Sequence, residues 1–215
     1  HFVIAPRSSW VLTKTLIIPA EITITGYNNT GEGYTFKKGF DGDLAQVGVF
    51  VHLNGIVFDG NKAEHTGNGL ADGPMTKNRE RTGTREQIFT RVTIKNCAGD
   101  GFLLWAHYYS KYLFCNFINN DGYAIHYRRI RTHYTDNFFE SCRFAGNAKG
   151  CMAFHGLECT SVWENSVFEN NGGPVFHQFV VHKKARGGIQ DFTDKGAYVI
   201  GVRNSSFMSN KAPLW

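Results

Sequence analysis

One short pattern recurs along the chain and restricts its fold more than any other feature. A large apolar residue is followed, two or three positions later, by an asparagine in a polar turn, and copies lie 23 to 27 residues apart except at two longer gaps. The apolar anchors are Phe58, Ile94, Phe117, Phe144, Phe168 and Phe207. A repeat of this length indicates a solenoid, in which each unit packs only against its neighbours.

Two further sets of positions predict how each repeat unit is built. Side chains two apart on a strand share a face, and the residues two before the anchors are small or apolar, so we expect both sets in the core. These inward positions are Ile56, Val92, Cys115, Cys142, Ser166 and Ser205. Asn tolerates the left-handed conformation, and its amide can bond along a stack of identical turns. The resulting ladder is expected to contain Asn61, Asn96, Asn119 or Asn120, Asn147, Asn170 or Asn171, and Asn210.

Composition supports strands and excludes several other classes of protein. Hydrophobic residues make up 42% of the 215 residues and aromatic residues 14%, which excludes a disordered chain. The 24 glycines against five prolines favour strands and tight turns over helices. A net charge of +5 without a long basic run argues against nucleic-acid binding, and no apolar run reaches the roughly 18 residues of a membrane span.

The five cysteines lack metal-ligand spacing and are odd in number, so we expect buried thiols and neither disulfides nor zinc.

We expect a single domain over residues 1–215, with two polar insertions at 63–86 and 180–196. The chain starts at His1 inside an apolar strand and stops directly after a turn, so we interpret it as a fragment of a longer protein. The insertions are expected to carry specificity or subunit contacts, because long loops tolerate variation and often hold binding residues.

Several consecutive copies of the repeat follow the segment SWVLTKTLIIPAEITITG at 9–26. Together they resemble the right-handed parallel β-helix proteins of the pectate-lyase-like superfamily, and the segment is similar to the start of the β-helix in phage tailspikes and other glycan-degrading β-helices. The resemblance implies an all-β, right-handed parallel β-helix of about seven or more rungs. It also implies a polysaccharide or cell-surface glycan as partner, a homotrimer, and a place in a virion tail or outside the cell. We expect no cofactor.

Adjacent rungs lie about 4.8 Å apart, so candidate sites are sought at equal positions in successive units. Four residues before the anchors, Glu140 and Glu164 come one rung apart, and their carboxyl groups would lie about 5 to 7 Å from each other, as in glycosidases. A like-charged neighbour raises the pKa of a carboxyl group, which suits a general acid. Arg143 or Arg203 would orient the sugar or, in the alternative interpretation, pair with these glutamates on a solvated surface.

A second pair of carboxylates, Asp100 and Asp121, precedes the turn glycines of GDGF and NDGY. The pair would serve the same chemistry, although a tight turn also selects Asp-Gly for its conformation alone. The sequence FHG at 154–156 is faintly similar to the Gly-His-Gly of polygalacturonase-like β-helices, but the paired aspartates of that family are absent.

A third column is predicted to bring Trp105, His126, His155 and His177 together near the ends of the strands that follow the turns. Alternation from the inward residues places these rings outside or at a corner, where they would hold sugar rings, act as a base, or only stabilise the sheet. Ligands along one flat column converge poorly on a tetrahedral ion, so no metal site is predicted. Tyr127 belongs to a set of aromatic residues expected to line a glycan groove or a subunit interface.

With the resemblance, the sequence predicts a carbohydrate-active β-helix, a polysaccharide depolymerase of tailspike type. Glu140 with Glu164, ahead of Asp100 with Asp121, would act as acid and base on a glycosidic bond. The other chemistry is that of a lyase, in which Arg, His or Tyr removes a proton next to a uronate carboxylate. The alternative from a different class is a non-enzymatic β-helix that binds a receptor or decorates a particle.

Overall fold

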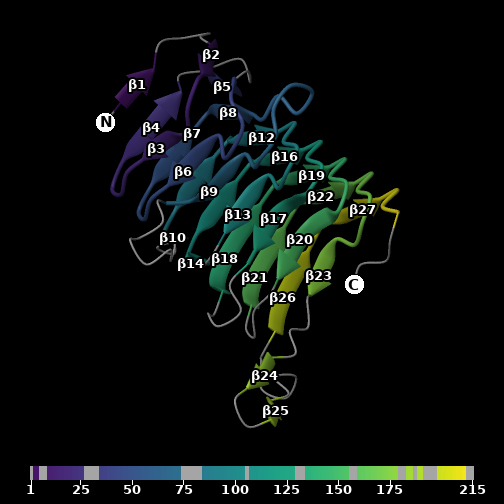
Figure 1. Cartoon of the computed structure of the whole chain (residues 1–215). Coiled ribbons are helices and arrows are strands. Elements are labelled where there is room, and N and C mark those ends of the chain that lie inside the picture. Colours follow the sequence, from purple (N-terminus) through teal and green to yellow (C-terminus); the bar gives the residue numbers. More distant parts are fainter. Residues whose placement is uncertain are drawn as a thin grey trace.

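Three parallel sheets wind around one core in the computed structural model (Figure 1). The structure describes residues 2–4, 9–26, 34–73, 84–104, 107–128, 134–154, 159–178, 183–185, 188–190 and 198–211. Each rung contributes one strand to sheet A, then one to sheet B, then one to sheet C, and sheet B has eight strands within the described residues. The chain is therefore an all-β, right-handed parallel β-helix, as predicted.

The strands of each sheet follow one another in chain order. Sheet A contains β1 (Phe2–Ile4), β4 (Thr23–Gly26), β7 (His52–Asn54), β11 (Ile88–Thr90), β15 (Lys111–Leu113), β18 (Tyr134–Glu140), β21 (Cys159–Glu164) and β26 (Tyr198–Arg203). Sheet B contains β2 (Ser9–Leu12), β5 (Tyr34–Lys38), β8 (Ile56–Asp59), β12 (Thr93–Lys95), β16 (Asn116–Ile118), β19 (Arg143–Ala145), β22 (Val167–Glu169) and β27 (Ser206–Met208). Sheet C contains β3 (Leu16–Ile18), β6 (Ala45–Val47), β9 (Leu70–Asp72), β13 (Phe102–Leu104), β17 (Tyr123–Tyr127), β20 (Gly150–Phe154) and β23 (Phe176–Gln178).

Four short strands lie beside this regular winding. β10 (Thr84–Arg85) and β14 (His107–Tyr108) pair in parallel, and β14 extends alongside β18. β24 (Lys183–Ala185) and β25 (Gly188–Gln190) form an antiparallel hairpin, which projects from the body of the solenoid in Figure 1. No helix long and apolar enough to cross a membrane occurs in the described part of the chain.

Five of the six predicted anchors are buried and form the central stack of the core, whereas Phe207 is 37% exposed because β27 is the end strand of sheet B in the described part of the chain. The six anchors lie in register on successive strands of sheet B, and Phe36 and Trp10 continue the column toward the first rung. Ring centroids are 5.0 Å apart for Phe117 and Phe144 and 5.2 Å for Phe144 and Phe168, with nearly parallel planes. Each buried phenylalanine contributes about 1.5 to 3 kcal/mol through the apolar surface it removes from water, so this stack is a main source of stability.

In the described part of the chain, successive corners contain one residue in the left-handed conformation, although the turn between β2 and β3 has none. The corner before sheet A uses Glu21, Phe50, Glu86, Tyr109 and Asp136. The corner between sheets A and B uses Arg91, Phe114, Ser141, Asn165 and Asn204, and the corner between sheets B and C uses Asn96, Asn119, Gly146, Asn170 and Ser209. This conformation costs a non-glycine residue about 1 to 2 kcal/mol, so the packing of the rungs imposes it on the bulky residues.

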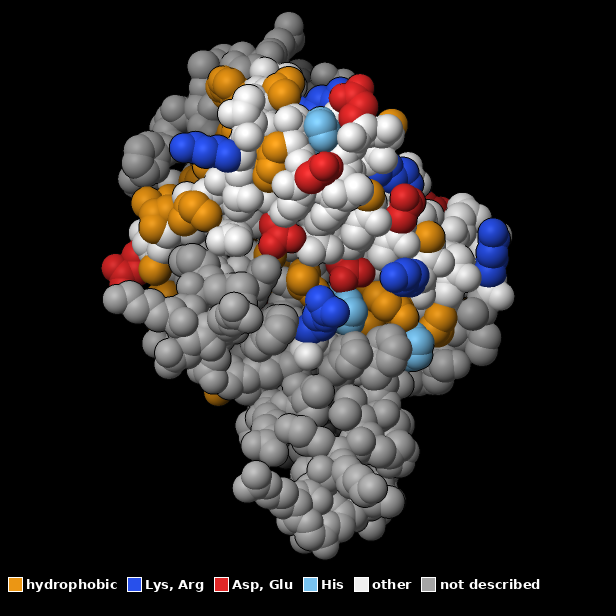
Figure 2. All heavy atoms as spheres, viewed as in Figure 1, with side chains coloured by type: hydrophobic (Ala, Val, Ile, Leu, Met, Phe, Trp, Pro, Cys, Tyr) orange, Lys and Arg blue, Asp and Glu red, His pale blue; other side chains and the backbone are white. Residues whose placement is uncertain are grey.

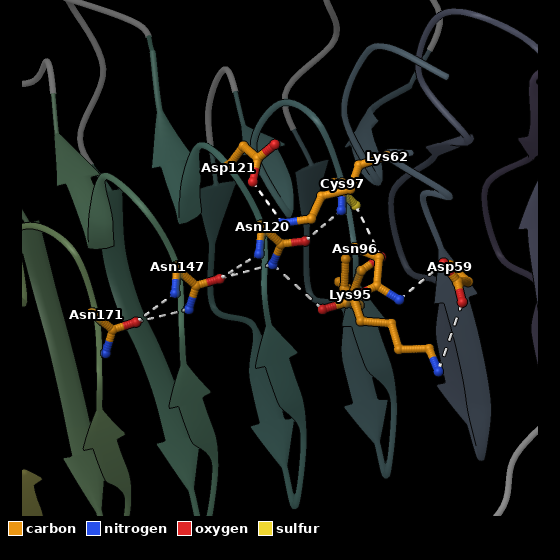
Figure 3. A network of polar contacts seen from close by, with 10 residues as sticks. Asp59, Lys62, Lys95, Asn96, Cys97, Asn120, Asp121, Asn147 and Asn171 are labelled. Atoms are coloured by element: carbon orange, nitrogen blue, oxygen red, sulfur yellow. Dashed lines mark hydrogen bonds and ion pairs between the residues drawn. The ribbon is translucent and has the colours of Figure 1, made fainter. Parts of the chain in front are cut away.

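At many of the described corners, the residue after the left-handed one points inward, and where it is polar it can bond to the next rung. Between sheets B and C, Asn120, Asn147, Asn171 and Asn210 form a continuous amide ladder, three of whose members are labelled in Figure 3. Asn147 accepts from Asn120 Nδ2 at 2.9 Å and donates to Asn171 Oδ1 at 3.0 Å. The predicted ladder is confirmed for these four residues. The other predicted members, Asn61, Asn96, Asn119 and Asn170, have positive φ and serve the turns.

Shorter ladders stabilise the other two corners. Before sheet B, the backbone N–H of Cys142 donates to Ser166 Oγ at 3.2 Å, and that of Ser166 donates to Ser205 Oγ at 3.1 Å. Before sheet A, the backbone N–H of Ser110 donates to Asn137 Oδ1 at 3.3 Å.

Four cysteines, Cys97, Cys115, Cys142 and Cys151, are buried free thiols, as the sequence predicted.

Part of the first predicted insertion belongs to the solenoid. Leu70, within 63–86, lies in register with Ala45 of the previous rung and Phe102 of the next, so β9 is an ordinary strand of sheet C. The second insertion, 180–196, includes the hairpin of β24 and β25, and its other residues lie outside the described part. The organisation as one domain of a longer protein stays a prediction.

We expect Asn147→Ala to lower the free energy of unfolding by about 2 to 4 kcal/mol, because buried groups of Asn120 and Asn171 lose their partners. Asn116→Ala is the control. Its amide bonds Thr93 Oγ1 on the outer face at 3.3 Å, and its removal should cost less than about 1 kcal/mol. Urea unfolding measures both values, and equal losses would contradict a stabilising ladder.

Two exchanges at the corner between sheets A and B test the cost of the left-handed residues. Ser141 and Asn165 occupy this corner in adjacent rungs with φ of 53° and 51°. Ser141→Asn should raise the free energy of unfolding by about 0.5 to 1 kcal/mol and Asn165→Ser should lower it by a similar amount, because Asn tolerates this conformation better. Thermal unfolding shows whether each variant is more or less stable than the wild type. A change in stability in the same direction for both variants would contradict the cost assigned to the left-handed conformation.

Candidate functional site

On the outer face of sheet C, Asp100 and His126 form a close pair. His126 lies on β17, and Asp100 lies in the turn before β13, one rung earlier. His126 Nδ1 is 2.7 Å from Asp100 Oδ2, and only 13% and 14% of the two side chains are exposed. Asp100 Oδ1 accepts the backbone N–H of Tyr123 at 2.8 Å. The carboxylate therefore orients the imidazole and favours the tautomer with its proton on Nδ1.

Turn residues of neighbouring rungs position this carboxylate. A Cβ atom at Gly122 would lie 2.2 Å from Asp100 Oδ1, so only glycine leaves room for it. The backbone N–H of Asp100 donates to Asn68 Oδ1 at 2.8 Å, and Asn68 Nδ2 donates to Asp43 Oδ1 at 2.8 Å. Asp100 is thus held from the rung below and from the rung above.

Tyr123 reaches from β17 across β20 to His177 on β23. Its phenolic oxygen lies 2.6 Å from His177 Nδ1. The residues of β20 in register with Tyr123 and His126 are Gly150 and Ala153, which are small enough to let the phenol pass. The Tyr123 ring also meets the edge of the His126 ring, with centroids 5.3 Å apart.

Asp100, Tyr123, His126 and His177 thus form one group, called here the His126 cluster. On the face shown in Figure 2, histidine, carboxylate and cationic side chains lie close together over sheet C. Burial, and to a smaller extent the charge of Asp100, raises the pKa of Tyr123. The phenol therefore stays protonated at neutral pH and suits a proton donor, whereas an imidazole is the usual general base.

The predicted column of Glu140, Glu164 and Arg203 is present, but on sheet A. The three residues lie in register on β18, β21 and β26. Arg203 Nη1 donates to Glu164 Oε1 at 3.2 Å, so this carboxylate is part of an ion pair. Arg143 does not belong to the column, because it lies on β19 of sheet B, where its Nε donates to Glu169 at 2.6 Å.

Asp100 and Asp121 do not form the predicted pair. The backbone N–H of Asp121 donates to Cys97 O at 2.8 Å, and its carboxylate accepts from Lys62 Nζ at 2.6 Å (Figure 3). Asp100 instead meets Tyr123 and His126. The pairing fails because the turn before β17 is shifted in register, so that Tyr123 and not Asp121 lies against Asp100.

The predicted column of Trp105, His126, His155 and His177 is wrong in part. The residues in register with His126 are Leu103 and Ala153, and His177 follows Ala153. His126 and His177 therefore do share a column, with one small residue between them. Trp105 and His155 come two positions later in the chain than Leu103 and Ala153 and lie outside the described residues.

Tyr127 does not contact a glycan at the surface, because it belongs to the core. Its side chain is fully buried and stacks on Phe154 with centroids 5.8 Å apart. The aromatic residue that does join the candidate site, Tyr123, was not predicted. Simple alternation from His126 places it on the opposite face, and the signal that would have found it is the glycine at 150, directly in register with it.

No group of three or more His, Cys, Asp or Glu side chains arranged to hold a metal ion occurs among the described residues. The chemistry available to the His126 cluster from its own side chains is proton transfer.

No family model and no curated protein matches this chain. Among solved structures it is similar to pectin methylesterase from Aspergillus niger in deglycosylated form, with a TM-score of 0.47 and 11% identity over 94% of this chain and 78% of that chain. The penultimately deglycosylated form of that enzyme gives 0.47 and 12% over 93% and 77%. The A-module of the mannuronan C-5 epimerase AlgE4 from Azotobacter vinelandii gives 0.40 and 11% over 93% and 87%. Likeness at this level concerns the fold alone and carries no argument about function.

The raised pKa of Tyr123 predicts a pH dependence of stability. A raised pKa in the folded state contributes stability that is present below the unfolded-state pKa of about 10 and is lost as the pH rises through the folded-state value. The loss of stability above about pH 10 should therefore be smaller in Tyr123→Phe than in the wild type. Tyr109→Phe, at an exposed tyrosine, is the control and should follow the wild type. The free energy of unfolding is measured by urea unfolding at each pH. The same loss of this free energy above about pH 10 in the wild type and in Tyr123→Phe would contradict the prediction.

Proposed function

We propose that this β-helix is a polysaccharide depolymerase with its active site at the His126 cluster. The observation that carries the proposal is the contact between two hydrogen-bonded pairs, Asp100 with His126 and Tyr123 with His177. Cleaving a sugar chain requires one group that accepts a proton and another that donates one to the departing oxygen. The cluster supplies both on one face of sheet C.

Each member of the cluster has a distinct role in this proposal. His126, oriented by Asp100, takes a proton through Nε2, and the carboxylate stabilises the imidazolium that forms. Tyr123 donates the proton of its hydroxyl to the departing oxygen. His177, whose Nδ1 lies 2.6 Å from that hydroxyl, takes a proton from solvent and passes one to Tyr123 for the next cycle.

A second candidate activity is glycoside hydrolysis on sheet A. Glu140 and Glu164 lie in register on adjacent strands, which keeps their backbones about 4.8 Å apart. Carboxyl groups on adjacent strands can reach the separation of about 5 to 5.5 Å that the acid and nucleophile of a retaining glycosidase have. The ion pair between Glu164 and Arg203 favours the first candidate, because one of the two carboxylates already has a cationic partner.

The biological setting is also a proposal. The resemblance of the segment at 9–26 to the start of tailspike β-helices supports a homotrimer and a place in a virion tail or outside the cell. The same resemblance supports a cell-surface polysaccharide as the partner.

Variants of the two candidate sites decide between them. On a panel of bacterial capsular and lipopolysaccharide glycans, we expect new reducing ends from the wild type, and a loss in kcat of at least about 100-fold for His126→Gln. Glu164→Gln, the matched control on sheet A, should stay within about threefold of the wild type.

The opposite ranking of the two variants would move the active site to sheet A. A folded wild type that releases no reducing ends from any glycan of a broad panel would contradict the depolymerase and favour the non-enzymatic, receptor-binding β-helix.

A further inference from the structure

Two of the buried cysteines, Cys115 and Cys142, lie beside each other on adjacent rungs. Each occupies the inward position directly before a strand of sheet B, and the two strands, β16 and β19, are neighbours (Figure 1). Strands β15 and β18 pair in register before the two cysteines, and β16 and β19 pair in register after them. The backbone N–H of Arg143 donates to Cys115 O at 2.9 Å, so the two peptide segments are directly hydrogen-bonded.

The separation of the two residues suits a disulfide bond. Equivalent residues of neighbouring strands lie about 4.8 Å apart. This value is within the range of about 4.4 to 6.8 Å between the Cα atoms of a disulfide. Both side chains point into the core, and each residue is only 1% exposed. The Cys142 thiol is also close enough to the Cys115 thiol to form a hydrogen bond with it.

The directions of the two thiols show which one has to move. Cys142 Sγ donates to Tyr112 O at 3.3 Å, in the rung of Cys115. Cys115 Sγ donates to Phe89 O at 3.4 Å, in the rung before. Cys142 therefore already reaches toward Cys115, and a turn of the Cys115 side chain about its Cα–Cβ bond brings the sulfurs together. The hydrogen bonds lost in this turn are weak, because a thiol is a poor donor.

The other cysteines whose side chains the structure describes lack such a neighbour. Cys151 lies in register with Ala124 of the rung before and Val175 of the rung after. The backbone N–H of Cys97 donates at 3.1 Å to Oδ1 of Asn120, which takes the equivalent position in the next rung. Among these four cysteines, Cys115 and Cys142 are the one pair at equal positions of adjacent rungs.

We propose that Cys115 and Cys142 form a disulfide bond in an oxidising environment, and that this bond links the rung of His126 to the next rung. The inference does not depend on the proposed function. The two cysteines are 27 residues apart, and the segment between them contains β17 with Tyr123 and His126. A link across a loop of this length restricts the unfolded chain and so stabilises the fold. The spacing in the sequence does not indicate the pair, because only the winding of the chain brings the two residues together.

The reaction consumes one molecule of a disulfide oxidant such as oxidised glutathione. One cysteine, as its thiolate, attacks a sulfur of the oxidant and releases one glutathione thiolate, which takes up a proton. The second cysteine attacks the resulting mixed disulfide and releases the second glutathione in the same way. Two protein thiols are oxidised and one oxidant disulfide is reduced, so atoms and electrons balance.

Burial determines when the bond forms. It raises the pKa of the Cys115 thiol, and the hydrogen bond with Cys142 raises this pKa further, so little thiolate is present in the folded rung. The exchange therefore takes place during folding, before the rung closes around the two side chains. Once the rung has closed, the same burial keeps reductants away from the bond.

The test is refolding of the full chain from urea with reduced and oxidised glutathione, beside refolding with dithiothreitol. Free thiols are then alkylated under denaturing conditions, and tryptic peptides are identified by mass spectrometry. Trypsin places the two cysteines in separate peptides, 112–128 and 132–143. We expect these peptides to be joined after oxidative refolding, and the midpoint of thermal unfolding to lie about 5 to 10 °C above that of the reduced protein.

Two variants show whether this particular pair is responsible. Cys142→Ser should lose both the joined peptides and the rise in the midpoint, and the change suits the column because Ser166 occupies the same position in the next rung. Cys151→Ala removes a buried thiol that has no cysteine in register on either side, and it should keep both effects.

Three results would overturn the inference. The first is alkylation of both Cys115 and Cys142 in a protein that has regained its β-sheet circular dichroism during oxidative refolding. The second is joining of either residue to other cysteines as often as to each other. The third, joined peptides without a rise in the midpoint, would overturn the stabilising role of the bond.

Discussion

At successive described corners of this solenoid one residue adopts the left-handed conformation, and the residue that follows commonly points inward and bonds to the next rung. At one corner this pair is Asn119 with Asn120, and at another it is Ser141 with Cys142. The left-handed residue costs about 1 to 2 kcal/mol when it is not glycine, and the inward hydrogen bonds and the aromatic stacks offset this cost. The position of every outward side chain then depends on where these corners fall.

The candidate site illustrates that dependence. Its four side chains come from three rungs, and no two of them are neighbours in the sequence. They meet because Gly122 leaves space for the carboxylate of Asp100, and because Gly150 leaves a passage for the ring of Tyr123. A shift of one residue in the register of β20 would place a larger side chain in that passage. Small residues therefore matter as much for this site as the groups that carry the chemistry.

The sequence was sufficient to predict the fold because the anchors recur at a steady spacing, and a column such as Phe117, Phe144 and Phe168 is confirmed in register. The corners at Phe114 and Tyr109 could not be predicted in this way, because bulky residues rarely adopt positive φ. The columns on sheet C were harder to align than those on sheet B. Turns of unequal length separate the two sheets, so equal distance from an anchor did not mean equal register.

The central claim is that ligand chemistry takes place on the outer face of sheet C, and hydrogen exchange tests it most directly. Amide exchange is measured by mass spectrometry with and without a polysaccharide that the protein retains. The account predicts slower exchange in β17, β20 and β23 when the polysaccharide is present, with little change in β18, β21 and β26. Protection confined to β18, β21 and β26 would place the ligand at the glutamates of sheet A and contradict the account.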